Sequence, residues 1–398
     1  MSAKRRMLHL FAWSGTVKRA VFGPKPKLVG VRRVQPAKVR SLGFVVALAG
    51  ACVWLGTARV AGSAYSIVDL GDPVGLFAQA RAINEHGQVV GLYLTTVAGN
   101  EVQRAVTWHA GGMSELGTLG GFNSRAVVIN SQGTIAGWAQ DNDDYARPVL
   151  WQGGMVMELP TLGGSQGTAW GLNDAGVAVG NTESGAGDFH ATLWSNDGVK
   201  DLGTLGGSYS VAYDVNTSGI VVGSALDDAN RERAVVWEGD VPVDLGALSA
   251  GNWTTARGIN DQGQIILWGK PADAPANRAA LWSGEFQDPV ITLGTFGGTE
   301  SWAYGLNNHG FVVGWAGRED ETYHAFVWDG TTMTDLGTLG GLYSSAYDIN
   351  DQGVIVGFAQ DAAGVTRAVA WVPVPEPGRF SLLALGTFVL WVMRQRQL

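Results

Sequence analysis

Asp335-Leu-Gly-Thr-Leu-Gly-Gly341 recurs along the 398-residue chain about every 43 residues, and this recurrence governs the architecture. Strict copies begin at Glu115 and Asp201, and looser copies begin at Asp69, Glu158, Asp244 and Thr292. A unit of this length cannot bury its apolar face alone, so neighbouring units must pack on one another. The sequence therefore predicts an array of similar units.

Three other landmarks keep step with this phrase. An Asn followed three residues later by Gly occurs at Asn84, Asn130, Asn173, Asn216, Asn260, Asn307 and Asn350. An Ala precedes each Asn by four residues, at Ala80, Ala126, Ala169, Ala212, Ala256, Ala303 and Ala346. A Trp closes each unit, at Trp108, Trp151, Trp194, Trp237, Trp282, Trp328 and Trp371. These independent columns agree on seven units.

Within a unit the local signals indicate short strands. In the last unit, 345–350 is strand-like and ends at an Asn-Asp-Gln-Gly turn, and two β-branched or apolar runs follow at 354–358 and 367–371. Elsewhere a Gly-containing turn at 195–198 leads to a fourth run at 199–202. No helical period intervenes between residues 65 and 373. Four strands in about 43 residues is the length of a β-propeller blade.

The two ends of the array complement each other. The seventh unit stops at Trp371 without a fourth strand, and an orphan strand at 65–70 precedes the first complete unit. Pairing the orphan with the last unit closes a ring and removes exposed sheet edges. We therefore expect an all-β, seven-bladed β-propeller of four-stranded repeats over residues 65–373. An open β-solenoid is the alternative.

Charge divides the chain. Residues 1–64 hold 12 Lys and Arg and no Asp or Glu, whereas residues 65–376 hold 12 Lys and Arg against 35 Asp and Glu, a formal net charge of −23. An acidic body repels nucleic acid and anionic lipid, and favours divalent cations, basic proteins or neutral sugars. The single Cys, Cys52, lies in the basic leader, so residues 65–373 can form no disulfide.

Both termini carry targeting signals. Residues 1–64 combine a basic segment with an apolar run, Phe44–Leu55, and small residues up to Ala64, which predicts a signal peptide. The basic segment is long for that class, so either translation begins downstream or the segment is retained as an N-terminal anchor.

Residues 374–398 contain Pro375, Glu376 and Pro377, an apolar run at 380–393, and then Arg394 and Arg396. This order resembles the PEP-CTERM sorting signal, in which a Pro-Glu-Pro motif precedes a short transmembrane segment and an Arg-containing tail. The resemblance implies that an exosortase in a Gram-negative envelope recognises the tail, after the secretion machinery has delivered the chain to the inner membrane.

The third strand carries a second resemblance. Tyr323-His-Ala-Phe-Val-Trp328 contains the His-Ala-Phe core of the HAF repeats, and 189–194 is a near copy. HAF repeats occur in exported bacterial proteins, often with a PEP-CTERM tail. The resemblance covers about residues 65–371 and implies no catalytic activity.

The His-Ala-Phe position is basic in every unit. It is occupied by Arg104, Arg147, His190, Arg233, Arg278, His324 and Arg367. An acidic column on the neighbouring fourth strand holds Asp69, Glu115, Glu158, Asp201, Asp244 and Asp335. We expect a structural ring of strand-to-strand ion pairs in preference to an anion site. Thr292 interrupts the acidic column, so Arg278 is expected to find another partner.

The predicted binding face combines the loops between second and third strands with the connections between units. Aromatic residues expected on this face are Trp138, Tyr209, Trp253, Trp268, Trp302, Trp315 and Tyr343. Aromatic rings stack on sugar faces, and carboxylates accept hydrogen bonds from hydroxyl groups or bind Ca²⁺. Asp141, Asp143 and Asp144 form the candidate calcium loop, although the alternative for many of the aromatic residues is packing between blades.

Two acids are candidates for catalysis. Asp214 and Asp348 occupy equivalent positions on predicted inner strands and can face a central channel as an acid pair. Solvated channel lining is the favoured alternative. No cofactor is expected besides the candidate calcium.

The expected function is therefore binding by an exported module at the cell surface or in the extracellular matrix. Exopolysaccharide or another envelope component is the expected ligand, and nucleic acid is not expected as a partner. A glycan-active propeller enzyme and a protein–protein docking scaffold are the alternatives.

Overall fold

The computed structural model describes residues 65–374, except for 72–74, 76, 110–111, 240, 247–250, 273 and 286–287. The predicted leader, signal peptide, Pro-Glu-Pro motif and C-terminal apolar run lie outside the described residues. All regular structure within the described part is β-strand, as the repeat pattern predicts. No helix in this part is long and apolar enough to cross a membrane.

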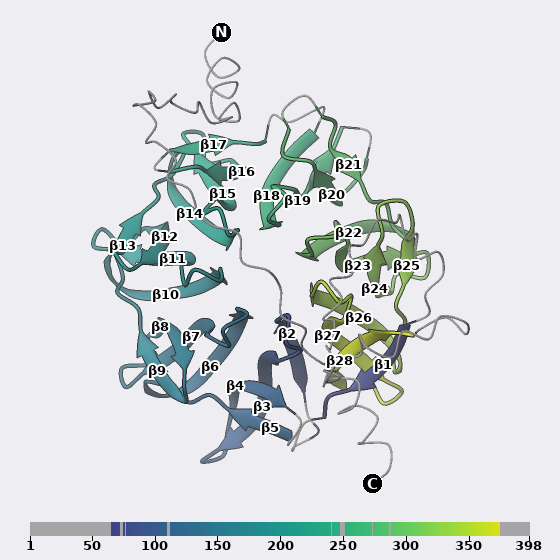
Figure 1. Ribbon diagram of the computed structural model, residues 1–398, viewed down its shortest axis with the longest axis horizontal. Coiled ribbons are helices and arrows are strands. Elements are labelled where there is room, and N and C mark those ends of the chain that lie inside the picture. Colours follow the sequence, from purple (N-terminus) through teal and green to yellow (C-terminus); the bar gives the residue numbers. More distant parts are fainter. Residues whose placement is uncertain are drawn as a thin grey trace, which may run out of the picture. The chain divides into compact units, whose positions relative to one another are not determined.

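The strands form antiparallel four-stranded units in chain order (Figure 1). Each unit is called a sheet here, although a single parallel residue pair joins the third to the fourth and the sixth to the seventh. The first contains β2 (Ala78–Ile83), β3 (Val89–Val97), β4 (Asn100–His109) and β5 (Gly112–Glu115). The second contains β6 (Gly120–Ile129), β7 (Ile135–Asp141), β8 (Ala146–Gln152) and β9 (Met155–Glu158). The third contains β10 (Gly163–Leu172), β11 (Ala178–Ser184), β12 (Phe189–Ser195) and β13 (Gly198–Asp201).

The same pattern continues through the second half. The fourth sheet contains β14 (Gly206–Val215), β15 (Val221–Asp227), β16 (Glu232–Trp237) and β17 (Pro242–Asp244). The fifth contains β18 (Gly251–Ile259), β19 (Ile265–Pro271), β20 (Arg278–Trp282) and β21 (Ile291–Thr292). The sixth contains β22 (Gly297–Leu306), β23 (Val312–Arg318), β24 (Tyr323–Trp328) and β25 (Met333–Asp335).

The last repeat supplies only three strands of its own, β26 (Gly340–Ile349), β27 (Ile355–Asp361) and β28 (Thr366–Pro373). Its fourth strand is β1 (Tyr65–Asp69), which pairs antiparallel with β28 and places Ile67 opposite Trp371. The orphan strand expected at 65–70 is therefore β1, and its partner is the strand that the repeat pattern indicates. Strand β2 in turn contacts β26, β27 and β28.

Successive sheets meet face to face, in the manner of a β-propeller, with their first strands on the inner side (Figure 1). Buried apolar clusters lie between neighbouring sheets; one of them joins Val313 and Ala325 of the sixth sheet to Ala346 and Trp371 of the seventh. The repeated Ala is fully buried in these seams. A small residue is needed there because two sheets approach closely.

The repeated phrase links one sheet to the next. Leu336 of Asp335-Leu-Gly-Thr is buried, and its carbonyl oxygen accepts a hydrogen bond from the indole Nε1 of Trp371 at 2.9 Å. Thr338 Oγ1 donates to the carbonyl oxygen of Gly341 at 2.9 Å. Trp237 makes the equivalent bond to Leu202 O at 2.9 Å. Three other closing tryptophans donate to the next residue of the phrase instead: Trp108 to Gly71 O, Trp151 to Gly117 O and Trp194 to Pro160 O. The repeated phrase and the closing Trp are thus joined by a hydrogen bond and stabilise the same connection between sheets.

Glycine is required on the second strand. A Cβ on Gly314 of β23 would lie 1.8 Å from the carbonyl oxygen of Trp302 on the inner strand, a distance that no side chain tolerates. The turn between these two strands needs glycine for a different reason: Gly310 has φ of +79°, which disfavours residues with a Cβ. The Gly-rich composition therefore follows from close strand packing as well as from turns.

Candidate functional site

Four of the predicted aromatic residues form one row across the last three sheets. Trp268 of β19 lies 3.6 Å from Trp302 of β22, between ring centroids, and Trp302 stacks on Trp315 of β23 at 5.9 Å. Tyr323 of β24 continues the row at 4.9 Å, and Tyr343 of β26 stacks on Tyr323 at 4.7 Å. We call these five residues the aromatic row. All five retain partial solvent exposure.

Tyr323 is the member that sequence reasoning missed. It begins the third strand of its sheet and pairs in parallel register with Tyr343 of the next sheet. This pairing carries the row from one sheet to its neighbour. The signal in the sequence was the aromatic residue directly before the His-Ala-Phe core, at Tyr323 and again at Phe189.

Three predicted aromatic residues lie apart from the row. Trp253 is only 2% exposed, so its ring is part of the core and cannot stack on a ligand; this prediction was wrong. Tyr209 is paired with Phe189 between the third and fourth sheets, and Trp138 of β7 lies opposite Arg125 of β6. Both remain partly exposed.

The predicted structural ring of ion pairs is present in part. His190 Nδ1 lies 2.9 Å from Asp201 Oδ2, His324 Nδ1 lies 2.9 Å from Asp335 Oδ2, and Arg147 Nε lies 3.8 Å from Glu158 Oε1. Arg278, whose column partner is Thr292, donates to the carbonyl oxygen of Asn277 at 3.2 Å. Arg104 makes no ion pair among the described residues, and its Nε is buried without a hydrogen-bond acceptor.

Three of the ring arginines have a closer partner that the sequence reading overlooked. Arg147, Arg233 and Arg367 pair with an aspartate six residues earlier, at the end of the second strand. These aspartates are Asp141, Asp227 and Asp361. Each also accepts backbone N–H bonds from its own turn; for Asp227 the bond from the Arg231 N–H, with those from the Arg231 and Arg233 side chains, holds the carboxyl pKa well below its usual range.

The candidate calcium loop is a turn of this kind. Asp141 Oδ1 accepts hydrogen bonds from the N–H groups of Asp143 and Tyr145, at 2.9 and 3.0 Å, and Oδ2 accepts one from Arg147 Nε at 2.6 Å. The side chains of Asp143 and Asp144 are exposed. No group of three or more His, Cys, Asp or Glu residues in the described part of the chain is placed to hold a metal ion.

The repeated Asn residues lie directly after the C-terminal ends of the inner strands, where they form a belt of hydrogen bonds. Each Asn donates from Nδ2 to the backbone oxygen of the next Asn in the series, at 3.0 to 3.3 Å, and Asn350 donates to Asn84. All seven are buried. Each Oδ1 caps its own turn, as Asn260 Oδ1 does for Gln264 N at 2.9 Å. The reading of these residues as structural fits this arrangement, although the bonds between units were not foreseen.

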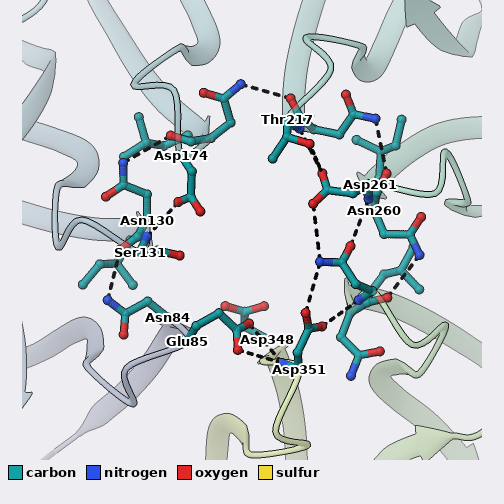
Figure 2. A pocket seen from close by; sticks show the side chains of 18 of the residues that line it. Asn84, Glu85, Asn130, Ser131, Asp174, Thr217, Asn260, Asp261, Asp348 and Asp351 are labelled. Atoms are coloured by element: carbon teal, nitrogen blue, oxygen red, sulfur yellow. Dashed lines mark hydrogen bonds between the residues drawn. The ribbon is translucent and has the colours of Figure 1, made fainter. Parts of the chain in front are cut away.

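A cavity of about 190 Å³ opens inside this belt (Figure 2). The residues that follow the belt asparagines line it, namely Glu85, Ser131, Asp174, Thr217, Asp261, Asn308 and Asp351. All of these side chains except Ser131 and Thr217 accept a backbone N–H bond from the neighbouring unit, for example Asp351 Oδ1 from Asn308 N at 2.8 Å and Glu85 Oε1 from Asp351 N at 3.0 Å. None of the predicted ligand-binding aromatic residues lines this cavity.

Asp214 and Asp348 tie neighbouring inner strands together. Asp348 Oδ2 accepts the N–H of Ile83 at 2.9 Å, and Asp214 Oδ2 accepts that of Ile259 at 2.9 Å. In each case Oδ1 accepts the N–H of the next residue in the chain. Burial raises the pKa of both carboxyl groups, that of Asp348 to about 7. Because both oxygens of each are engaged by backbone, the arrangement fits a structural role and not the acid pair of a glycosidase.

This burial predicts a pH dependence. A folded pKa near 7 lies above the ordinary value, so ionising Asp348 in the folded state costs free energy that the unfolded chain does not pay; the folded protein loses stability as pH rises from about 4 to 7. Asp348→Asn removes the ionisable group and with it this free-energy cost. We expect the free energy of unfolding of the variant, relative to the parent, to rise by on the order of 3 kcal/mol across that window. Urea unfolding at pH 4, 5.5 and 7 measures it, and a constant difference would contradict the assignment.

The structure also brings together residues that sequence reasoning did not single out. They precede the belt asparagines by three residues, and six of the seven are aromatic or Arg: Arg81, Trp170, Tyr213, Arg257, Tyr304 and Tyr347. The Arg81 guanidinium lies 4.2 Å from the centroid of the Tyr347 ring, and that of Arg257 lies 4.4 Å from Tyr213. We call these six residues the arginine–aromatic layer.

Comparison with known proteins gives likeness of fold only. No family model and no curated protein matches the chain. Among solved structures, the β-propeller domain of the trilobed protease from Pyrococcus furiosus is similar over 74% of this chain and 95% of that one, with 11% identity and a TM-score of 0.49. TolB from Acinetobacter baumannii matches over 61% and 62%, with 14% identity and a TM-score of 0.42.

A lectin from Aleuria aurantia, in complex with Fucalpha1-6GlcNAc, matches over 76% of this chain and 97% of that one, with 11% identity and a TM-score of 0.33. Similar folds thus occur in proteins of unlike activity. At this level of similarity the activities of those proteins say nothing about this chain.

Proposed function

We propose that this chain is an exported binding module that attaches to exopolysaccharide or another envelope component through the aromatic row. The observation that carries the proposal is the row itself, in which five partly exposed rings from three successive sheets lie in contact. A row of rings offers repeated apolar surface with hydrogen-bonding edges, which suits the faces and hydroxyl groups of a sugar chain. No covalent step is part of this proposal.

The platform for this row is a closed ring of seven blades. Support comes from the pairing of β1 with β28, from the contacts of β2 with the last sheet, and from the bond of Asn350 Nδ2 to Asn84 O. Trp108 of the first complete unit also donates to Gly71 O, just after β1, at 3.0 Å. A closed ring holds the rings of the row at fixed spacing, because its sheets have no free edge along which to slide.

Export completes the proposal. The basic leader and apolar run within 1–64 would direct the chain to the secretion machinery, and the tail at 374–398 would engage an exosortase at the inner membrane. The module would then reside in the envelope, on the surface or in the matrix of a Gram-negative cell. Detection of the protein in surface and culture fractions, and its loss when Pro375-Glu376-Pro377 is replaced by alanines, tests this part.

Removal of one ring from the row tests the binding claim. Trp315→Ala deletes the ring between Trp302 and Tyr323, and we expect it to weaken binding to the polysaccharide of the producing organism by about 1 kcal/mol, or roughly fivefold. Isothermal titration calorimetry, with calcium and with chelator, measures the effect. Tyr145→Ala is the matched control, because Tyr145 is an exposed aromatic residue outside the row.

Thermal unfolding of both variants shows whether they remain folded. Equal affinity of a folded Trp315→Ala variant and its parent would refute a role for the row. Absence of any binding by the parent protein would refute the carbohydrate assignment itself and leave protein docking as the function to pursue.

A further inference from the structure

Three arginines on the inner strands form no ion pair, although the carboxyl group of Asp214 is near enough to Arg257 to favour its charge. Arg81 of β2, Arg125 of β6 and Arg257 of β18 make no side-chain hydrogen bond and no ion pair within 4.0 Å among the described residues. The Nε of Arg125 is buried without any acceptor. This is unusual in a body with 35 Asp and Glu residues, where a carboxylate is seldom far away.

The guanidinium group of Arg81 is close enough to repel those of Arg125 and Arg257. Burial lowers the pKa of Arg125 to about 10, and the charge of Arg81 lowers it further. Burial likewise lowers the pKa of Arg257; the charge of Arg81 contributes, whereas Tyr213, Tyr304 and Asp214 act in the opposite direction. The charge of Arg81 therefore acts on both of the others, although the three come from the first, second and fifth sheets. They form a single positive cluster on the inner side of the sheets.

Aromatic rings surround this cluster. Tyr347 lies under Arg81, and Tyr213 and Trp170 lie 4.4 and 5.9 Å from Arg257. Tyr304 packs edge-on against Tyr347 at 5.3 Å, as Trp170 does against Tyr213 at 6.1 Å. Cation–π contact of this kind offsets part of the cost of desolvating a guanidinium, and it leaves the N–H donors unused.

Placing three guanidinium groups together with only one nearby carboxyl group, that of Asp214 beside Arg257, opposes folding. Among the described residues, the belt asparagines and the strand-end aspartates find polar partners, whereas Arg81 and Arg125, like Arg104, form no ion pair. A chain that gains nothing from the cluster in the folded state would be more stable with apolar residues there. The cost is explained if a ligand supplies the missing negative charge.

We propose that Arg81, Arg125 and Arg257, with the rings of the arginine–aromatic layer, bind the carboxylate of an acidic sugar. This inference rests on the proposed function and specifies the class of glycan, namely polysaccharides that contain uronic acids. A carboxylate matches the planar fork of a guanidinium bidentately, and the sugar ring that carries it can pack on Trp170, Tyr213 or Tyr347. The cluster would recognise one acidic residue, while the aromatic row holds the neighbouring sugars.

Binding of defined saccharides to the full chain tests the inference. The probes are oligogalacturonate, the same oligosaccharide with its carboxyl groups reduced to alcohols, and inorganic phosphate. We expect oligogalacturonate to bind at least about tenfold more tightly than the reduced form, and Arg257→Gln and Arg81→Gln each to abolish that preference. Arg231→Gln is the matched control, because Arg231 is 65% exposed and pairs with Asp227 at the protein surface.

Each failure has a distinct meaning. Equal binding of the acidic and reduced forms, both sensitive to Trp315→Ala, would overturn the carboxylate site and leave the proposed function intact. Phosphate binding as tight as that of oligogalacturonate would overturn the assignment to a sugar acid. Lack of binding by every saccharide would refute the proposed function as well.

The melting temperature of the free protein provides a second test, which needs no ligand. Arg81→Met removes a charge that has no ion pair among the described residues and keeps an apolar side chain over Tyr347, so the free protein should melt at a higher temperature than its parent. A structural role for Arg81 predicts the opposite. A lower melting temperature would therefore overturn the claim that the cluster is held for a ligand.

Discussion

Deletion of Tyr65–Asp69 from the full chain is expected to destabilise the protein more than any single substitution. β1 is the fourth strand of the last sheet, and its side chains pack into two clusters: Tyr65 and Ile67 with Trp371, and Val68 with Val372. Burial of an apolar side chain is worth about 1.5–3 kcal/mol when complete, so three partly buried ones contribute roughly 5 kcal/mol, a large part of the stability of a typical domain.

The measurement is chemical unfolding of the deleted chain beside its parent. A synthetic peptide spanning 64–71 provides the control, because added in trans it should pair with β28 and restore much of the lost stability. An unchanged unfolding midpoint in the deleted chain would mean that β1 contributes nothing to closing the ring.

The second large effect is expected from the asparagine belt. Asn260→Ala removes two bonds donated by Nδ2, to Asn307 O and Gln264 Oε1, and the bond that Oδ1 accepts from Gln264 N. Buried backbone groups left without partners cost about 1–3 kcal/mol each. We expect a loss of about 3 kcal/mol in the free energy of unfolding.

Gln262→Ala is the matched control, since Gln262 lies in the same turn and is exposed. It should leave the free energy of unfolding within about 0.5 kcal/mol of the parent value. Equal unfolding curves for Asn260→Ala and Gln262→Ala would show that the bonds between units are not part of what holds the sheets together.

The sequence predicts the repeating part of this protein well, because each repeated residue answers a requirement that recurs in every unit. Gly310 and its equivalents are needed for turn geometry, Ala303 for close packing, and Trp371 for the bond to the repeated phrase. Each of these requirements concerns a single unit or its contact with the adjacent unit. It therefore places the same residue at the same position of every repeat, and the sequence shows it.

The residues that vary between units were harder to predict. A β-bulge shifts the register of most inner strands just after the repeated Ala, as between Ala80 and Ala82. Simple alternation therefore fails there, and the orientation of Arg81, three residues before the belt Asn, does not follow from it. The buried position of Trp253 was missed for a related reason, because its register also shifts, between Trp253 and Thr255.

Overall charge does not describe the inner strands. A formal net charge of −23 over residues 65–376 favours neutral sugars, basic proteins or divalent cations as partners. The local arrangement of charge is different. Surface arginines such as Arg233 form an ion pair with an aspartate, whereas Arg81 and Arg125 form none and Arg257 has only a longer-range attraction to Asp214. Ligand recognition depends on the charges at a site that are not balanced by a neighbouring residue. Such charges can be identified only from the three-dimensional structure, which shows which residues form ion pairs.

The central claim is that a glycan lies along the aromatic row, and a crystal structure with a bound acidic oligosaccharide tests it most directly. The account predicts sugar rings against Trp315, Tyr323 and Tyr343, with a carboxylate in contact with Arg81 or Arg257. An oligosaccharide bound instead in the cavity inside the asparagine belt, with the aromatic row empty, would contradict it.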